Sequence, residues 1–380
     1  MSNRLTFVNG QVLVAGQWQD GARLDLAEGR IVAIAPASED ATDEVVDLGG
    51  GRLVPGLIDI QVNGGGGVLF NDDPTPEGIA AMAAAHAGRG TTGILPTLIS
   101  GSVAMIAAGL DAVDAAIEAG VPGCLGIHVE GPVLNRERKG IHAEDRLVPL
   151  GDDLIELLCR PRKGRVLFTI APEYLDDAQA QALKAAGVIL SMGHSNADYD
   201  TAREAFARGV TGVTHLFNAM SALHHRAPGM VGAALENQEA WCGIIVDGHH
   251  VHPAALRVAL ATRPLDRFVL VSDAMPCVGS PSDHFLLDGR RITVAGGRCV
   301  DDAGTLAGAS LDLACAVRNS VEMVGLPLEA ALAMASASPA AFLGMAGDRG
   351  TIAPGHFADL TWLDADGEPR GAWIAGQRAG

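Results

Sequence analysis

The sequence is poor in basic residues. Lysine occurs only as Lys139, Lys163 and Lys184, and the 27 Lys and Arg residues are outnumbered by 45 Asp and Glu residues, giving a formal net charge of -18. Proteins that bind nucleic acid or anionic membranes need a basic surface. We therefore expect neither as a partner, and an anionic substrate would have to be held by a local basic cluster.

The chain also lacks paired cysteines, long apolar runs and a signal sequence. No apolar run reaches the length that spans a membrane, and residues 1–7 lack a basic segment followed by an apolar one. Scattered cysteines without a C-x-x-C pair are typical of reduced thiols in a cytosolic protein. We expect a soluble, cytoplasmic protein. The cysteines are Cys124, Cys159, Cys242, Cys277, Cys299 and Cys315.

Short apolar strands alternate with helices through the middle of the chain. Eight strand–helix units in series predict an α/β fold, a parallel (β/α)8 TIM-type barrel over residues 55–347 rather than an open sheet. A β-hairpin insertion is expected near residues 281–305. The predicted strands are residues 57–62, 93–97, 124–129, 166–170, 188–192, 212–215, 243–246 and 268–272, and the predicted helices include residues 76–88, 102–118, 176–186, 198–207, 252–261 and 310–324.

Both ends of the chain have β character. In residues 1–54, short alternating segments at 5–9, 11–14, 23–26 and 30–35 are separated by Asn9-Gly10, Ala15-Gly16 and Glu28-Gly29, which are turn signals typical of β-hairpins. A similar pattern returns in residues 348–380. Because a closed barrel would bring the two ends together, we predict that they form one second, small β-sandwich-like domain.

Four polar residues close predicted barrel strands. Glu130, His194 and His215 are ligands that a catalytic divalent ion accepts, and three protein ligands leave a position open for water. Asp273 ends the eighth strand, where it can exchange a proton with that water and with a leaving group. Any one of these residues alone could be structural. Together at one barrel rim they predict a metal-dependent hydrolytic site.

Two amides on the first strand bear on the number of metal ions. Side chains alternate along a strand, so Asp59, Gln61 and Asn63 share one face. Many metal-dependent hydrolases on this fold place two histidines there to hold a second ion, whereas amides are poor metal ligands. A single-metal site is therefore favoured. The alternative is that these amides only bond to neighbouring loops.

Further histidines lie on the predicted rim loops. His142 lies on a loop where it can polarise a carbonyl oxygen, unless it is simply exposed, while His128 is expected to be packed and hydrogen-bonded inside the barrel. Arg226 and His250 belong to basic segments that follow the sixth and seventh strands, common positions for phosphate. A solvated surface cluster is the alternative for these segments. Roles for the neighbouring His224, His225, His249 and His252 are not assigned.

These motifs resemble those of the N-acetylglucosamine-6-phosphate deacetylases, a family of the amidohydrolase superfamily, over essentially the full chain. The most specific of them is residues 214–220, Thr-His-Leu-Phe-Asn-Ala-Met. The others are residues 55–64, 128–132, 193–195 and 271–275, with Asp247-Gly248 and His250. The resemblance implies hydrolysis of N-acetyl-D-glucosamine 6-phosphate to D-glucosamine 6-phosphate and acetate.

The resemblance also implies roles for individual residues. Metal ligands would be Glu130, His194 and His215, with Asp273 as acid/base and His142 stabilising the oxyanion. One divalent ion per subunit is implied, with Zn expected first and Fe, Co, Mn or Ni as alternatives. The enzyme would be a homodimer in which Arg226 reaches the neighbouring subunit's site. Substrate contacts would come from Gln61, Asn63, Ile141, Asn218, Ala219, Arg226, His250, Leu306, Ala307 and Gly308.

Other functions compete with this one. The same reaction on N-acetyl-D-galactosamine 6-phosphate is the nearest, because inverting one hydroxyl need not change any of these motifs. A cyclic-amide or nucleobase amidohydrolase is disfavoured, since those enzymes usually carry the paired histidines on the first strand. A catalytically silent barrel used for assembly is disfavoured because such proteins typically lose their metal ligands.

Overall fold

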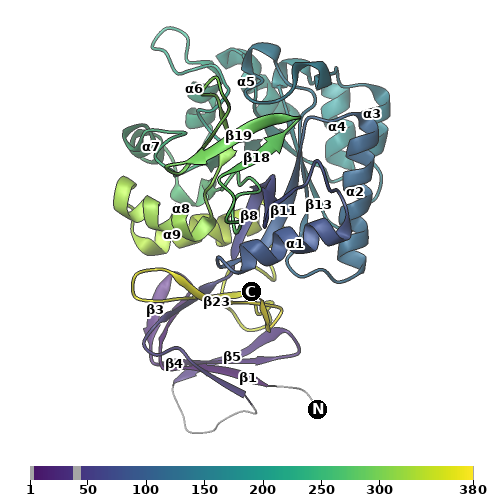
Figure 1. Cartoon of the computed structure of the whole chain (residues 1–380). Helices are drawn as coiled ribbons and strands as arrows, with labels where there is room; N and C mark the ends of the chain where they lie inside the picture. The colour runs from purple at the N-terminus through teal and green to yellow at the C-terminus, as the bar shows by residue number, and fades with distance from the viewer. Residues whose placement is uncertain (1–3, 37–43, 380) are drawn as a thin grey trace.

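The computed structural model describes residues 4–36 and 44–379, and shows a barrel of parallel strands beside smaller β-sheets that contain strands from both ends of the chain (Figure 1). Residues 1–3, 37–43 and 380 of the predicted β-domain lie outside the described residues. The division at residues 54 and 347 stays a prediction.

The barrel is one eight-stranded sheet in which every neighbouring pair is parallel. Beyond the last strand, Ala274 bridges to Val62 and accepts a 2.9 Å hydrogen bond from the Asn63 N–H, so the last unit meets the first. The predicted (β/α)8 fold class is confirmed. The strands are, in spatial order, β8 (Leu57–Val62), β11 (Thr91–Ile99), β12 (Gly126–Glu130), β13 (Arg165–Ile170), β14 (Ile189–Met192), β15 (Gly212–Val213), β16 (Trp241–Ile244) and β17 (Phe268–Leu270).

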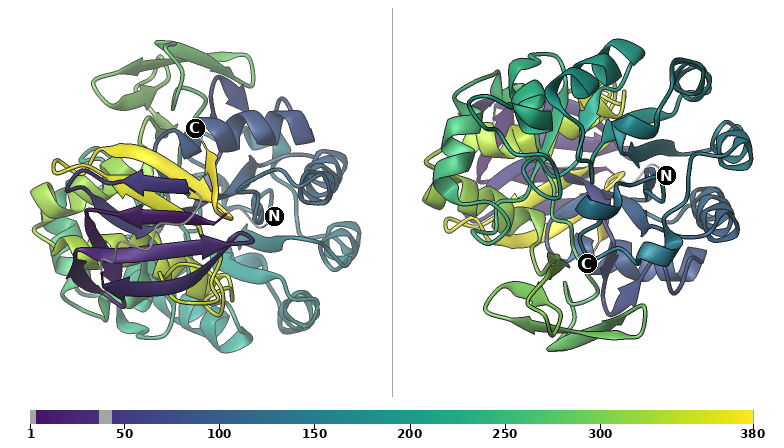
Figure 2. Two further views of the ribbon diagram at one scale, coloured as in Figure 1. Left: turned by 90° about the horizontal axis from the view of Figure 1, so that it is seen from below. Right: turned by 90° about the horizontal axis from the view of Figure 1, so that it is seen from above.

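Helices surround the strands, as the view from above shows (Figure 2, right). Several start at a side chain that accepts a backbone N–H, for example Ser102 before α2 and Asp198 before α5. The helices are α1 (Pro76–Ala87), α2 (Val103–Glu118), α3 (Asp152–Leu158), α4 (Asp177–Ala185), α5 (Tyr199–Arg208), α6 (Gly229–Glu236), α7 (Pro253–Leu260), α8 (Leu313–Asn319), α9 (Leu328–Ala335) and α10 (Ala337–Phe342), with single turns η1 (Arg136–Arg138), η2 (Glu144–Arg146), η3 (Pro172–Tyr174) and η4 (Leu265–Arg267).

One predicted helix differs in both extent and type. The helix expected over residues 310–324 begins only at Leu313, because the Asp312 side chain accepts the Cys315 N–H and caps it. Its second half is the π-helix η5 (Ser320–Val324), which ends at Gly325 in the left-handed conformation. Apolar periodicity does not distinguish an α-turn from a wider π-turn, so the change was not foreseen.

The chain ends build two sheets across the bottom of the barrel (Figure 2, left). One has the order β5-β4-β1-β6, and the other, β24-β23-β22-β7-β2-β3, combines strands from both ends. Phe7 and Trp373 pack edge to face between them, with ring centroids 4.8 Å apart. The strands are β1 (Leu5–Val8), β2 (Gln11–Val14), β3 (Gln17–Asp20), β4 (Ala22–Ala27), β5 (Arg30–Pro36), β6 (Glu44–Asp47), β7 (Arg52–Pro55), β22 (Leu360–Leu363), β23 (Pro369–Ile374) and β24 (Gln377–Ala379).

The hairpin predicted at Asn9-Gly10 is wrong. β1 pairs with β4 and β6, while β2 pairs with β3 and β7, so the Asn9-Gly10 turn carries the chain from one sheet to the other. Gly10 lies so close to the Gly51 carbonyl that a Cβ atom would stand 2.6 Å from that oxygen. The turn signal locates a reversal of the chain but not the partner of each strand, because pairing depends on long-range packing. Glu28-Gly29 does join a hairpin, β4–β5.

An antiparallel sheet follows β17 and precedes α8. It comprises β18 (His284–Leu287), β19 (Arg290–Ala295), β20 (Arg298–Val300) and β21 (Leu306–Ala309), and residues 284–309 are called the flap below. Figure 1 shows β18 and β19 in front of the barrel strands. Ala309 is joined to the rim, since its N–H donates to the Asp273 carbonyl at 2.8 Å. The flap is therefore anchored next to the residue that ends the eighth unit.

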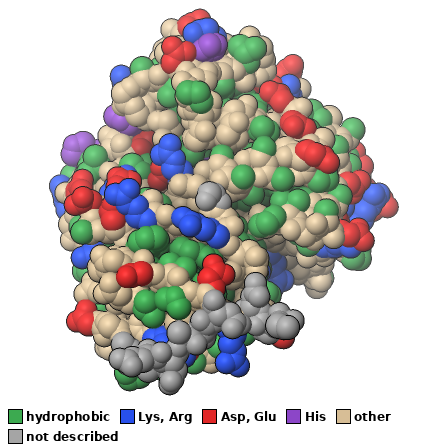
Figure 3. Space-filling model, turned by 60° about the horizontal axis from the view of Figure 1, so that its bottom comes forward, with side chains coloured by type: hydrophobic (Ala, Val, Ile, Leu, Met, Phe, Trp, Pro, Cys, Tyr) green, Lys and Arg blue, Asp and Glu red, His purple; other side chains and the backbone are tan. Residues whose placement is uncertain are grey.

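Two surface properties bear on the expected partners. Within the described ranges, the structure contains no helix that is long and apolar enough to cross a membrane. On the face seen in Figure 3, acidic and basic side chains are interspersed. A cytoplasmic location stays a prediction.

Strand β8 connects the chain-end sheet to the rim of the barrel. Its preceding strand β7 pairs with β22, and the Gly56 N–H donates to the Asp359 carbonyl at 2.8 Å, which fixes the start of β8 against the chain-end sheet. The other end of β8 faces the rim, and the polar residues described next lie there.

Candidate active site

The predicted rim residues lie around one cavity of about 330 Å³. Glu130 is the last residue of β12, while His194, His215 and Asp273 follow β14, β15 and β17 by two or three residues. Parallel strands present their carboxyl ends on one side of a barrel, which brings these residues together. The lining residues are Asn63, Ile99, Glu130, Gly140, Ile141, His142, His194, His215, Asn218, Ala219, His250, Asp273, Met275, Gly304, Thr305, Leu306 and Gly308.

Glu130, His194 and His215 form a compact, buried cluster. The two histidine Nε2 atoms are 3.0 Å apart and lie 3.3 Å (His194) and 3.1 Å (His215) from Oε1 of Glu130. Ligands at about 2.0–2.1 Å from a tetrahedral ion stand roughly 3.3 Å from one another. The three atoms therefore have the spacing and the chemistry of a divalent-metal site.

The surroundings of the two rings support the same interpretation. His194 Nδ1 donates to the Arg138 carbonyl at 2.9 Å, so in the neutral ring the Nε2 lone pair points to the cluster. Burial alone would raise the pKa of Glu130, but hydrogen bonds from His194 and His215 hold it well below its usual range. The carboxylate is thus ionised, as a metal ligand must be.

Three site residues occupy a strained backbone conformation. His194, His215 and Asp273 have φ angles of 47°, 31° and 52°, a region that residues other than glycine rarely adopt. Each lies two or three residues after the end of a strand, where the chain turns at the rim. Strain of this kind is concentrated at functional sites. The predicted strands 212–215 and 268–272 end earlier than expected, at Val213 and Leu270.

Asp273 is held by the two amides of β8. Asn63 Nδ2 donates to its Oδ1 at 2.7 Å, and Gln61 Nε2 donates to the same oxygen at 3.3 Å. Gln61 Nε2 also lies 3.2 Å from Oε1 of Glu130. Burial and the neighbouring Glu130 carboxylate raise the pKa of Asp273. Amide N–H groups thus lie between the Glu130 and Asp273 carboxylates. A second cation at this place would need ligands with a free lone pair, which an N–H group does not offer.

Asp59 closes the barrel beneath this layer. It is fully buried, and its Oδ1 accepts the N–H groups of Gln61 at 3.2 Å and Ser272 at 3.3 Å. The carboxyl therefore links the first strand to the end of the last. Burial raises the pKa of Asp59 to about 7.

His142 lines the cavity on the side of the cluster. Its Nδ1 lies 2.7 Å from Ser100 Oγ, and its ring stands edge to face with His194 at 4.6 Å between centroids. Burial, followed by the nearby His194, lowers the pKa of His142 to about 3, so the ring is neutral. In the tautomer in which Ser100 donates to Nδ1, the proton of the neutral ring lies on Nε2, where an oxygen in the cavity can accept it.

His128 is packed and hydrogen-bonded inside the barrel, as predicted. Its Nδ1 lies 3.3 Å from Thr97 Oγ1 and its Nε2 lies 2.8 Å from Thr169 Oγ1. Burial lowers its pKa to about 4. Both ring nitrogens are occupied, which leaves neither for a metal ion.

Polar groups also lie where a sugar phosphate is expected. His250 Nδ1 donates to Asp247 Oδ2 at 2.6 Å, which fixes the ring at the cavity wall. The Asn218 N–H donates to the His215 carbonyl at 3.0 Å, whereas the Ala219 N–H has no hydrogen bond within the described residues. Ala219 is therefore the better candidate of the two backbone donors.

The structure does not bring Arg226 to the site of its own chain. Arg226 is exposed on the loop before α6 and lines a different cavity together with His224. Among the described residues that line the site cavity there is no lysine or arginine.

Gln61 and Ala307 lie just behind the lining, both buried. Sequence reasoning did not select five lining residues: Ile99, Gly140, Met275, Gly304 and Thr305. Gly140 and Thr305 adjoin residues that were selected, which was the available signal. Ile99 and Met275 are apolar and resemble core residues in sequence.

Comparison with known proteins identifies the family of the chain. Residues 52–379 match the Amidohydrolase family. N-acetylgalactosamine-6-phosphate deacetylase of Shewanella sp. (strain ANA-3) is 40% identical, covering 97% of this chain and 94% of that one. N-acetylglucosamine-6-phosphate deacetylase of Haemophilus influenzae is 34% identical, covering 88% and 89%. The crystal structure of N-acetylglucosamine-6-phosphate deacetylase from Pasteurella multocida superimposes with a TM-score of 0.95 at 34% identity, covering 99% of both chains.

The barrel, its rim cluster and these matches place the chain in the amidohydrolase family. Within that family, the resemblance to the N-acetylglucosamine-6-phosphate deacetylases inferred from the motifs is confirmed, and relatives named for the galactosamine epimer are similar as well.

Proposed function

We propose that the protein hydrolyses N-acetyl-D-glucosamine 6-phosphate to D-glucosamine 6-phosphate and acetate. The observation that carries the proposal is the buried Glu130–His194–His215 cluster, which shares one cavity with Asp273 and His250. A hydrolytic centre and a polar wall for an anionic group would thus share a cavity the size of one small substrate. The names of the similar proteins support the same substrate class.

The second candidate substrate is N-acetyl-D-galactosamine 6-phosphate. A relative that is 40% identical over 97% of the chain carries that name, against 34% for the glucosamine-named relative from Haemophilus. The two substrates differ only in the orientation of one hydroxyl, and nothing in the metal cluster would distinguish them. The preference for one epimer would therefore be set by the residues that contact the sugar ring.

One divalent ion would be held by Glu130, His194 and His215, with Zn²⁺ as the first choice because the ligands are one carboxylate and two imidazoles. Such an ion would acidify a water molecule and polarise the acetyl carbonyl. The donor amide of Gln61, bonded to both Glu130 and Asp273, favours a single ion per chain.

Asp273 would move the protons. Both amide hydrogen bonds fall on its Oδ1, which leaves Oδ2 to accept a proton from the attacking water. The same oxygen would then donate that proton to the amine nitrogen as the C–N bond breaks. Its raised pKa, caused by burial and by Glu130, makes the protonated state easier to reach.

His142 would stabilise the oxyanion that forms on the acetyl carbonyl. A neutral ring with its proton on Nε2 is a hydrogen-bond donor that requires no prior ionisation. The adjacent Ile141 and the flap residues Leu306, Ala307 and Gly308 would enclose the sugar.

The phosphate would contact the Ala219 N–H, His250 and an arginine from a second copy of the chain. The cavity has no Lys or Arg among its described lining residues, yet the chain carries a net charge of -18 that repels a dianion. Arg226, exposed and outside its own cavity, is the residue that a homodimer would bring there. Asn218 would help to position this part of the rim.

The test is acetate release from the two epimeric N-acetylhexosamine 6-phosphates and from unphosphorylated N-acetylglucosamine. The proposal expects both phosphorylated sugars to be far better substrates than the free sugar, with the glucosamine epimer preferred. Hydrolysis of neither phosphorylated sugar by metal-loaded protein would contradict it.

A further inference from the structure

Two cysteines meet between the barrel rim and the flap. Cys277 lies on the loop that follows Asp273, and Cys299 lies in β20. Their sulfur atoms are 3.6 Å apart although the residues are 22 positions apart in the sequence. A disulfide requires a sulfur–sulfur distance of about 2.05 Å, so an approach of roughly 1.5 Å would join them.

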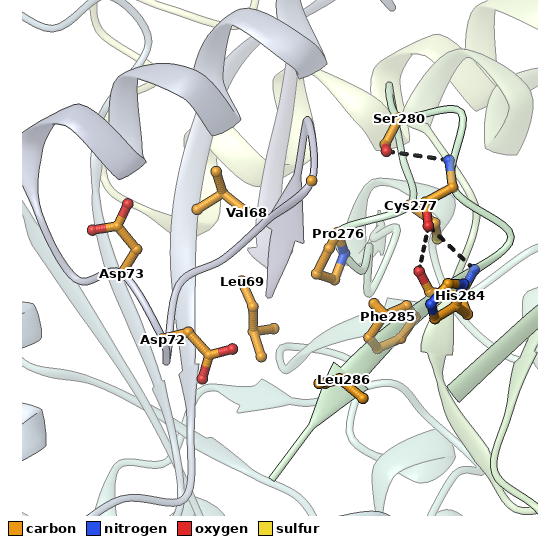
Figure 4. A pocket seen from close by; sticks show the side chains of 12 residues that line it. Val68, Leu69, Asp72, Asp73, Pro276, Cys277, Ser280, His284, Phe285 and Leu286 are labelled. Carbon is orange, nitrogen blue, oxygen red and sulfur yellow. Dashed lines mark hydrogen bonds between the residues drawn. The ribbon is translucent and has the colours of Figure 1, made fainter. Parts of the chain in front are cut away.

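The two thiols differ in how they can be reached. Cys277 is partly exposed and lines a cavity of about 400 Å³, on the wall opposite Val68 (Figure 4). Cys299 has no exposed surface and packs with Met275 and Ile292 in the apolar cluster between the flap and the rim. A small oxidant can therefore reach Cys277 through this cavity. The buried Cys299 sulfur is in contact with the Cys277 sulfur, 3.6 Å away.

Their contact also makes them unequal in acidity. The sulfur–sulfur hydrogen bond with Cys299 lowers the pKa of Cys277 despite partial burial. The same contact, together with burial, raises the pKa of Cys299. Because the thiolate is the reactive form, Cys277 is the nucleophile of the pair and Cys299 is its partner.

We propose that Cys277 and Cys299 form a peroxide-reactive dithiol that closes to a reversible disulfide and thereby slows the enzyme. The Cys277 thiolate attacks hydrogen peroxide, so that an S–O bond forms, the O–O bond breaks and hydroxide leaves. The Cys299 sulfur then attacks the sulfenic acid sulfur, so that the S–S bond forms, the S–O bond breaks and water leaves. The proton that Cys277 loses on ionisation converts the released hydroxide to water, so the net reaction consumes one peroxide and two thiols and yields one disulfide and two waters.

The bridge would disturb the site because of where the two sulfurs are attached. Cys277 is four residues after Asp273 and two after Met275, which lines the site cavity. Cys299 is in the strand that pairs with β21, whose Leu306 and Gly308 line the same cavity. To bring the two sulfur atoms roughly 1.5 Å closer, the segment that contains Met275 and the strand β21 must move toward each other. A misplacement of about 1 Å in an active site can cost about a hundredfold in rate, so we expect kcat/KM to fall at least about tenfold.

The test is oxidation of the metal-loaded protein with a small excess of hydrogen peroxide, followed by blocking of free thiols. Non-reducing peptide mapping should find Cys277 linked to Cys299, and dithiothreitol should reverse the link. Acetate release should fall as the disulfide forms and recover as dithiothreitol reduces it. Cys277→Ala, a partly exposed position outside the site cavity, should keep its activity in peroxide. The control Cys315→Ser should respond like the wild-type protein.

The peptide map does not depend on the proposed function, whereas the activity measurement rests on it. If the reduced protein released no acetate, the proposed function would fail while the map still tested the bridge. Free or over-oxidised Cys277 without a link to Cys299 overturns the dithiol. Equal inactivation of Cys277→Ala and wild-type protein, or a complete bridge with kcat/KM unchanged, overturns its effect on turnover.

Discussion

Replacement of Asp273 by asparagine tests the proton-transfer role most sharply, because the structure specifies how the new side chain would sit. Oδ1 of Asp273 accepts N–H groups from Asn63 at 2.7 Å and Gln61 at 3.3 Å. An asparagine would turn its carbonyl oxygen toward those donors and place its NH₂ group where Oδ2 now lies. That group cannot accept a proton from water.

The expected loss follows from the loss of general acid/base catalysis alone. Such groups contribute about a hundredfold to ten-thousandfold, which corresponds to about 2.7–5.4 kcal/mol of transition-state stabilisation. The side chains are nearly equal in shape, so KM and metal content should change little. The melting temperature should not fall, because the change removes a buried carboxylate that Glu130 repels.

Steady-state acetate release, elemental analysis and a thermal melt together check this prediction. Asp302→Asn, an exposed position in the flap, is the matched control and should behave like wild type. If Asp273→Asn kept kcat within tenfold of wild type while retaining its metal, another group would have to carry the proton.

Three further predictions address the metal, the oxyanion and the phosphate. Elemental analysis should find one divalent ion per wild-type chain, and Gln61→His with Asn63→His should raise that number; two tightly bound ions in the wild type would refute the single-metal site. His142→Ala should lower kcat by about a hundredfold to a thousandfold with the metal retained, as loss of an oxyanion donor does, so near-normal turnover would exclude that role. Arg226→Ala should lower kcat/KM for the phosphorylated sugar by a factor equivalent to about 1.5–3 kcal/mol of transition-state stabilisation, and it should leave kcat/KM for the free sugar unchanged. Mixed with Asp273→Asn chains, it should regain activity if Arg226 acts across a dimer; no recovery in proven heterodimers would place Arg226 elsewhere.

The sequence was informative where a local pattern and a common fold rule act together. Glu130, His194 and His215 could be grouped because each follows an apolar strand, and parallel strands in a barrel open on one rim. That Gln61 and Asn63 share one face of the first strand followed from the alternation of side chains along a strand. None of these inferences needed a distant contact to be known in advance.

It was less informative where long-range packing decides. The turn at Asn9-Gly10 was located, but β1 and β2 joined different sheets because strand pairing depends on partners far along the chain. Met275 looks like an ordinary core residue in sequence, but it lines the cavity, where its N–H donates to the Ala309 carbonyl of the flap at 3.0 Å. Arg226 was expected, from the resemblance, to reach the site of a neighbouring subunit, and the structure places it outside the cavity of its own chain.

The most direct test of the proposed reaction is acetate release by the metal-loaded protein from N-acetyl-D-glucosamine 6-phosphate, with the galactosamine epimer and unphosphorylated N-acetylglucosamine in parallel. We predict turnover that requires the metal and the phosphate, with the highest kcat/KM for the glucosamine epimer. A higher kcat/KM for the galactosamine epimer would assign the enzyme to that sugar, and no metal-dependent acetate release from either phosphorylated sugar would contradict the deacetylase function itself.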